Sequence, residues 1–198
     1  MALQPFVLQM LTLLNWPLIS QLVYVTLWGC TLSWVTSVLA LYLSWKPSSR
    51  HPFLLASLHT LIEFNMSMEL IITVVYWQMI HEDVVVKLQD QGDDLSIFIN
   101  VYIHFLPLVS MASLVVFSNI RFQARHFPFT LVVSTGFILV NFTAVKITGV
   151  VYYSFFPFDD VQSWVTALVL VLCASWCYLV TARVVNLMPK AALGADQK

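Results

Sequence analysis

Five long runs of apolar residues, separated by short polar segments, dominate this chain. The runs cover roughly residues 18–45, 53–80, 96–118, 129–153 and 163–187. Each run reaches the length of about 20 residues that a helix needs to cross a bilayer. Because backbone groups in lipid must be hydrogen-bonded within their own segment, the runs predict helices. The pattern therefore predicts an all-α, polytopic membrane helix bundle that forms a single membrane domain over residues 1–198. A shorter apolar stretch, residues 4–14, predicts an N-terminal interfacial helix.

The segments between the apolar runs alternate in charge. Lysine or arginine occurs in residues 46–52, in residues 119–128 and at the C-terminal end, whereas residues 1–15, 81–95 and 154–162 are acidic or lack basic residues almost entirely. Five membrane crossings produce this alternation, because basic segments stay on the cytoplasmic side. The pattern predicts that the C-terminus faces the cytoplasm or a mitochondrial matrix. Residues 81–95 are expected to form a short acidic excursion that is ordered only by contacts.

Composition narrows the classes of function. The chain is 60% hydrophobic and 10% charged, against about 25% charged residues in an average soluble domain. The net charge of −1 and the lack of a basic stripe argue against nucleic acid as a partner. The expected partners are membrane lipids and other integral membrane subunits.

No cofactor or metal site is expected. His59 and His104 invite a comparison with the axial ligands of a haem, but their depths differ by about seven residues, or roughly 10 Å at 1.5 Å per residue. Two ligands of one haem need similar depth. A glycine-rich phosphate loop and a G-x-S-x-G elbow are also missing from the sequence.

Four ionisable residues lie well inside the apolar runs, namely Glu63, Glu69, His104 and Lys146. A charge at membrane depth costs about 2.5–3.5 kcal/mol on insertion scales, so such residues usually pair with each other or face a cavity. Counting along the helices places Glu69, His104 and Lys146 in one layer. We therefore predict a Glu69–Lys146 ion pair with His104 beside it. The pair either fixes the register of the helices or marks a functional site.

His59 and Glu63 form a second polar group. They are one helical turn apart and share a face of the predicted helix. A Glu–His couple inside a membrane either relays protons or forms a structural hydrogen bond. Glu63 and Glu69 lie about 120° apart around the same helix, so they do not form a carboxylate dyad.

Three patches resemble the androgen-induced membrane protein family, whose members include intramembrane hydrolases of fatty acid esters of hydroxy fatty acids. The patches are residues 15–20 (NWPLIS), residues 100–107 (NVYIHFLP) and residues 147–153, which contain Thr148-Gly149 and Tyr152-Tyr153. The family uses a threonine nucleophile and a histidine. The resemblance implies that His104 is that histidine and that Ser20, a hydroxyl-bearing residue, stands in the place of the threonine.

The sequence is compatible with two hypotheses of different class, one a non-catalytic subunit and the other an enzyme, so it leaves open whether the protein is an enzyme. The first is a structural or accessory subunit of a larger membrane complex, with a respiratory complex of the mitochondrial inner membrane as the favoured setting. It is supported by a stripe of small residues, Gly29, Ser33 and Ser37, that lets another helix approach closely. The alternative is an intramembrane lipid-ester hydrolase that uses Ser20 and His104. A small transporter or proton relay is a third, weaker alternative.

Overall fold

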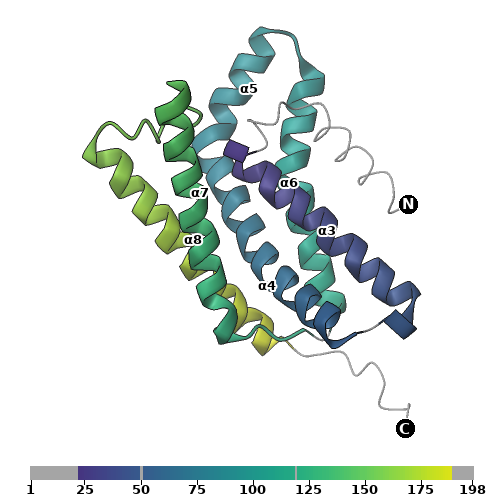
Figure 1. Cartoon of the computed structure of the whole chain (residues 1–198). Helices are drawn as coiled ribbons and strands as arrows, with labels where there is room; N and C mark the ends of the chain where they lie inside the picture. The colour runs from purple at the N-terminus through teal and green to yellow at the C-terminus, as the bar shows by residue number, and fades with distance from the viewer. Residues whose placement is uncertain (1–21, 50, 119, 189–198) are drawn as a thin grey trace.

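Five long helices that alternate in direction make up the body of the described part of the protein. The computed structural model describes residues 22–49, 51–118 and 120–188. The long helices are α3 (Val25–Trp45), α4 (Pro52–Val75), α6 (Asp94–Phe117), α7 (Phe127–Thr148) and α8 (Val161–Leu187). Shorter elements are η1 (Pro47–Ser49), the π-helical segment η2 (Tyr76–Ile80), α5 (His81–Asp90) and η3 (Ala124–His126). Figure 1 shows their order in the bundle. The described residues contain no strand, so the prediction of an all-α bundle is confirmed.

All five predicted spans correspond to helices that are long and apolar enough to cross a membrane. The protein is thus an integral, multi-pass membrane protein by the length and composition of its helices. The predicted interfacial helix at residues 4–14 lies outside the described residues.

The acidic excursion is more regular than expected. Helix α4 continues through η2 and α5 up to Asp90, so a single helical rod covers Pro52–Asp90. No glycine or proline interrupts the chain between Phe53 and Gln91, and this explains the continuation. The chain then reverses at Gly92, which has φ +67, a conformation that glycine adopts at little cost. Asp93 caps α6 by accepting a hydrogen bond from the Ser96 backbone N–H.

The fourth span ends earlier than predicted. Helix α7 stops at Thr148, and Gly149 follows with φ +69 in the left-handed conformation typical of a helix C-cap. Tyr152 and Tyr153 therefore lie in the loop between α7 and α8 instead of in the helix. The earlier end also places Lys146 in the last turn of α7.

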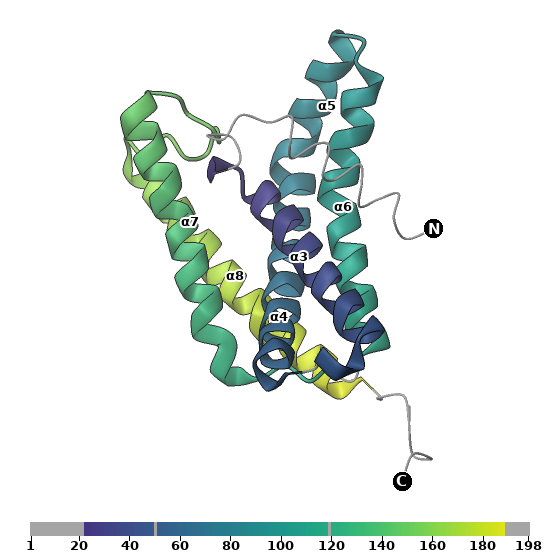
Figure 2. The same ribbon diagram turned by 45° about the vertical axis from the view of Figure 1, so that its right-hand side comes forward.

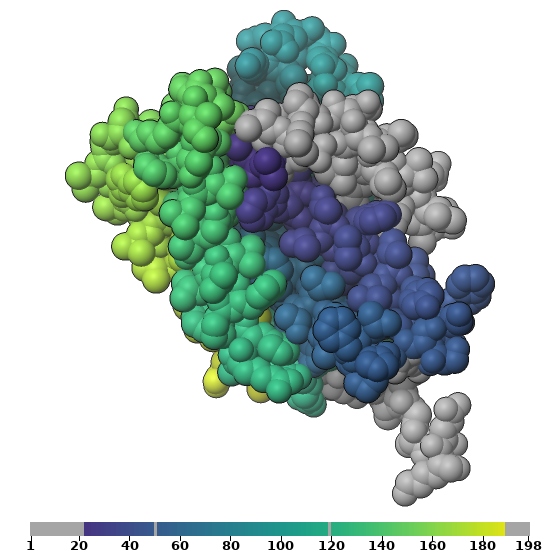
Figure 3. All heavy atoms as spheres, viewed as in Figure 1, coloured from purple at the N-terminus to yellow at the C-terminus, as the bar shows by residue number. Residues whose placement is uncertain are grey.

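Helix α4 occupies the centre of the bundle. It packs against α3, α6 and α8, while α7 packs mainly on α8. Figure 2 shows α3 and α4 in the middle, α5 and α6 on one side and the α7–α8 pair on the other. The two ends of the bundle differ in charge. The C-terminal end of α3, capped by Lys46, and the α6–α7 connection, which contains Arg121 and Arg125, mark one end, called the basic end below. The α5–α6 turn and the α7–α8 loop mark the opposite, acidic end, where α5 stands above the rest of the described surface (Figure 3).

The small-residue stripe on α3 is used inside the chain. A Cβ atom at Gly29 would lie 2.5 Å from Glu69 Oε1 and 2.8 Å from Ile72 Cδ1. Ser33 on the same face is buried and donates a hydrogen bond to Glu69. The stripe therefore allows α3 to approach α4, as expected of small residues between membrane helices.

Replacing Gly29 with alanine is expected to destabilise the protein by about 1–3 kcal/mol, because the added methyl group overpacks a filled interface. The free energy of unfolding in mixed detergent–dodecyl sulfate micelles measures the effect. Gly136, whose added Cβ would meet nothing within 4 Å, provides the matched control. A Gly29→Ala variant as stable as Gly136→Ala would contradict the close approach.

Candidate functional site

A threonine and a histidine meet where α3 begins. Thr26 Oγ1 lies 2.9 Å from His104 Nε2. Thr26 is the second residue of α3, and His104 is near the middle of α6. His104 is 7% exposed, whereas Thr26 is half-buried. The pair is thus held inside the protein but keeps one reachable side.

The contacts of the His104 ring define its tautomer. Its Nδ1 lies 2.7 Å from the carbonyl oxygen of Asn100, one helical turn earlier. A carbonyl only accepts hydrogen bonds, so Nδ1 carries the proton and Nε2 is left with its lone pair. The Thr26 hydroxyl therefore donates to Nε2. This is the arrangement in which a histidine base takes a proton from a hydroxyl nucleophile.

Residues of α4 and η2 contact both the ring and the backbone of His104. The Tyr76 ring stacks on His104 with centroids 3.6 Å apart and an interplanar angle of 10°. Tyr76 is the first residue of η2, and π-helical turns of this kind are frequent at functional sites. One turn earlier, Thr73 Oγ1 donates to the His104 carbonyl oxygen at 2.8 Å. Ring and backbone of His104 are both fixed.

A proline in α6 helps to join α3 to this site. Pro107 has no N–H, so the Ile103 carbonyl oxygen has no partner within the helix. Cys30 on α3 donates its S–H to that oxygen at 3.5 Å. The contact ties the first turns of α3 to α6 directly beside His104.

Tyr153 completes the surroundings of the α3 N-terminus. Its hydroxyl accepts a hydrogen bond from the Val25 backbone N–H at 3.0 Å and keeps its own proton to donate. Burial raises the pKa of Tyr153 above its ordinary value, so the phenol is neutral. N–H groups in the first turn of a helix have no carbonyl partners inside it, and the helix dipole favours negative charge there. The site thus offers the Tyr153 O–H and the positive end of the α3 dipole to a developing oxyanion.

Two cavities are bordered by the Thr26–His104 pair. An apolar cavity of about 70 Å³ extends from Thr26 and His104 between α4, α7 and α8, where Met68, Phe137 and Leu170 line it. An outer cavity of about 330 Å³ lies toward the acidic end and adds polar groups from Asp83, Asn100 and Ser154. Thr26, His104 and Tyr153 border both cavities. The pair therefore stands between an apolar compartment and a more polar opening.

Sequence reasoning selected His104 but did not single out Thr26. The predicted partner Ser20 lies outside the described residues. A threonine inside an apolar run gives little signal, because its hydroxyl commonly bonds to the carbonyl four residues earlier, as Thr31 and Thr36 do. Thr26 differs because α3 begins only at Val25, after Tyr24 with extended dihedrals. Its hydroxyl is thereby left to point at His104.

The predicted Glu69–Lys146 ion pair does not form. Lys146 is exposed, and its Nζ lies 3.5 Å from the Phe158 carbonyl oxygen and 5.7 Å from the Phe142 ring centroid. Because α7 ends at Thr148, Lys146 is close to the acidic end of its helix and its amine reaches outward. Glu69 is 1% exposed on the central helix and hydrogen-bonds with Ser33 instead.

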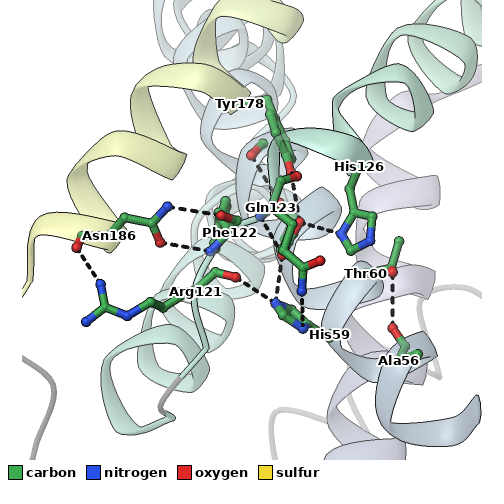
Figure 4. Close-up of polar contacts among 11 residues, drawn as sticks. Ala56, His59, Thr60, Arg121, Phe122, Gln123, His126, Tyr178 and Asn186 are labelled. Atoms are coloured by element: carbon green, nitrogen blue, oxygen red, sulfur yellow. Dashed lines mark hydrogen bonds and ion pairs between the residues drawn. The ribbon is translucent and has the colours of Figure 1, made fainter. Parts of the chain in front are cut away.

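The predicted His59–Glu63 couple is part of a larger cluster near the basic end. Glu63 is fully buried, and its Oε1 lies 2.7 Å from His59 Nε2. Its Oε2 lies 2.8 Å from His126 Nδ1 and accepts from the Tyr178 hydroxyl at 2.7 Å. The Gln123 backbone N–H donates to Oε1 at 3.0 Å. Figure 4 shows His59, Tyr178, Gln123 and His126 converging from α4, α8 and the segment around η3. The cluster fastens the α6–α7 connection to the bundle.

Within residues 22–49, 51–118 and 120–188 no group of three metal-ligating side chains is placed to hold a metal ion. No protein-family model, curated protein or solved structure matches this chain.

Proposed function

We propose that the protein is an intramembrane lipid-ester hydrolase in which Thr26 is the nucleophile and His104 the general base. The observation that carries this proposal is the 2.9 Å contact between Thr26 Oγ1 and a His104 nitrogen whose ring is oriented by the Asn100 carbonyl. A nucleophile, a base and a group that orients the base are the parts that covalent acyl transfer requires. The cavity beside the pair is apolar, which favours a lipid as the substrate.

In the first half of the reaction, Thr26 Oγ attacks the ester carbonyl carbon while His104 Nε2 takes the hydroxyl proton. The Tyr153 O–H is the available donor for the oxyanion, because the Val25, Leu27 and Trp28 N–H groups already donate to Tyr153 and to the Tyr24 carbonyl. When the tetrahedral intermediate collapses, the C–O bond of the ester breaks and His104 returns the proton to the departing alcohol. Thr26 then carries the acyl group as an ester.

Water from the outer cavity completes the cycle. It attacks the acyl carbonyl carbon, and His104 Nε2 takes one of its protons. Collapse of the second intermediate breaks the bond to Thr26 Oγ, which recovers a proton from His104 as the carboxylic acid leaves. Asp83, Asn100 and Ser154 around the outer cavity provide the polar lining that such a water needs.

The size of the cavity limits the substrate class. Its volume of about 70 Å³ is far below the ~300–1,000 Å³ of pockets that enclose a whole drug-sized ligand. It accommodates the part of an acyl chain next to the reacting carbonyl, with the remainder of the lipid outside in the bilayer. We accordingly propose long-chain esters as the substrate class and a divergent membership of the androgen-induced membrane protein family.

The proposed orientation follows from the charges at the two ends. Basic residues hold the C-terminal side in the cytoplasm or the mitochondrial matrix, so the acidic end and its outer cavity face the opposite compartment. The substrate ester then reaches Thr26 from the leaflet at the acidic end.

An activity-based probe tests the proposal directly. A fluorophosphonate is expected to label the purified protein, because Thr26 Oγ forms a bond to phosphorus as fluoride leaves and His104 takes the proton. Peptide mapping is expected to place the label on Thr26, and Thr26→Ala and His104→Ala are expected to abolish it. Thr31→Ala, on the same helix, is the matched control because the Thr31 hydroxyl donates to the Leu27 carbonyl. Labelling that maps to Ser20 would identify Ser20 as the nucleophile in place of Thr26. An unlabelled wild type would contradict the proposal.

The subunit hypothesis loses its structural support from the small-residue stripe, because the stripe packs against α4. Its test is the mass of the particle extracted in mild detergent. A particle near the 22.6 kDa of the chain plus its detergent supports an independent enzyme, whereas stable co-purifying membrane subunits favour the complex.

A further inference from the structure

The proposed reaction leaves one buried carboxyl group without a role. Glu69 is 1% exposed at the centre of the bundle, and Ser33 Oγ at 2.9 Å is its hydrogen-bond partner among the described residues. Inside their bounds, α3, α4, α6 and α8 contain a single lysine or arginine, Arg183, which is exposed near the basic end. The described ion pairs all involve Glu63, not Glu69. A permanent charge on Glu69 is therefore uncompensated.

Other titratable groups lie on α4 itself and on the elements packed against it. On the packed elements these groups are Tyr42 and Cys30 of α3, Asp94, Tyr102 and His104 of α6, Cys173, Cys177, Tyr178 and Arg183 of α8, and Arg125 and His126 of η3; α4 itself adds His59 and Glu63, and η2 adds Tyr76. In the described part of the chain, none of them forms a hydrogen bond or ion pair with Glu69. Protonation is the remaining way to neutralise this carboxyl group.

A hydrogen-bond chain next to Glu69 suits two protonation states. Asn65 Nδ2 donates to Ser33 Oγ at 2.9 Å, and Ser33 Oγ donates to Glu69 Oε1 at 2.9 Å. Asn65 is fully buried, yet its Oδ1 has no hydrogen-bond partner in the described part of the chain. If Glu69 is protonated and the Asn65 amide turns over, Glu69 donates to Ser33 and Ser33 donates to Asn65 Oδ1. The same three residues thus satisfy a carboxylate in one direction and a carboxylic acid in the other.

A cavity lined by serine hydroxyl groups and apolar side chains connects the Asn65–Ser33–Glu69 hydrogen bonds to the basic end. It has a volume of about 560 Å³ and lies between α3, α4 and α6. Six serines line it, namely Ser33, Ser37, Ser44, Ser110, Ser113 and Ser118. Ser44 and Ser118 lie where α3 and α6 end at the basic end, and Ser33 lies at the inner limit beside Glu69. Its hydroxyl groups and its volume meet the two conditions for holding water.

We propose that Glu69 is a proton-binding site that exchanges its proton with the basic side of the membrane through this serine-lined cavity. Hydroxyl groups and water carry the proton along the cavity to Ser33, and Ser33 passes it to the carboxylate, which becomes the neutral acid. The site is separate from Thr26 and His104 and does not rest on the hydrolase proposal. Gly29 belongs to it because any larger residue there displaces the carboxyl group.

Infrared spectroscopy of the full chain in lipid nanodiscs tests the protonation. We expect a carbonyl stretch of a protonated carboxylic acid that fades as the pH is raised and is missing from Glu69→Gln. Ser33→Ala is expected to keep the band but shift its frequency, because the hydrogen bond is lost. Glu82→Gln, an exposed acid on α5, is the matched control and leaves the band unchanged. A wild type without this band at every pH, or a band that neither Glu69→Gln nor Ser33→Ala alters, would overturn the proposal.

Cysteine accessibility in sealed vesicles tests the route. In a background with Cys30, Cys173 and Cys177 replaced by alanine, Ser110→Cys is expected to react with a membrane-impermeant thiosulfonate supplied on the basic side. Val109→Cys is the matched control, because Val109 is exposed on the outer surface of α6 and faces lipid. Reaction of Ser110→Cys from the acidic side alone, or equal reaction of both variants, would show that the cavity is not the aqueous route.

Discussion

Replacing His104 by alanine is expected to lower kcat for ester hydrolysis by about 10²–10⁴-fold, the usual contribution of a general base. The Thr26 hydroxyl loses the acceptor that lies 2.9 Å away in the wild type. Thr26→Ala removes the nucleophile and is expected to reduce kcat at least as far. The double variant should be no slower than Thr26→Ala alone, because residues that act as one catalytic unit are not additive. Turnover of a chromogenic long-chain ester in detergent micelles measures all three rates.

Companion variants separate catalysis from folding. Thr26→Ser keeps a hydroxyl and is expected to retain activity, while Thr31→Ala leaves the reaction unchanged because Thr31 bonds to the Leu27 carbonyl. Tyr153→Phe removes an oxyanion donor, and a fall in kcat of about 10²–10³-fold is expected on the precedent of other oxyanion sites. Wild-type rates in His104→Ala would place the chemistry elsewhere in the molecule.

The sequence was most informative about the membrane architecture. Apolar length and the alternation of basic segments predicted the five spans, because both follow directly from the thickness and the asymmetry of a bilayer. Helix ends were harder to place. The second rod runs on to Asp90 because nothing in it breaks a helix, while Gly149 ends the fourth span early. Such ends depend on local backbone chemistry that hydropathy does not record.

The candidate sites show a similar division. His59 and Glu63 lie on one helix, so their spacing alone brought them together. The partner of Glu69 depends on which helices are neighbours, and counting depth along separate helices carries no such information. Lys146 was paired by depth with a carboxyl group on α4, yet α7 packs mainly on α8. Thr26 became visible only once the start of α3 was known.

The Glu63 cluster should dominate the stability of the basic end. Replacing Glu63 by alanine is expected to lower the free energy of unfolding by about 3–5 kcal/mol, the range found when one partner of a buried ionic group is removed. The His126 ring and the Gln123 backbone N–H would lose their acceptor. His59 and the Tyr178 hydroxyl would lose the carboxylate and keep only the carbonyl oxygens of Arg121 and Gln123, each at 2.8 Å. Unfolding by dodecyl sulfate in mixed micelles, monitored by circular dichroism, measures the change.

Graded substitutions identify which feature of Glu63 matters. Glu63→Gln keeps an oxygen acceptor but loses the charge, so we expect a smaller loss of about 1–3 kcal/mol. Tyr178→Phe removes one donor and is expected to cost less than Glu63→Ala, because the carboxylate keeps both histidines and the Gln123 N–H. Glu82→Ala is the control, since Glu82 is exposed on α5. A Glu63→Ala variant as stable as Glu82→Ala would mean that the α6–α7 connection is held by other contacts. The hydrogen bonds between Asn186 and the backbone of Phe122 are then the next contacts to remove.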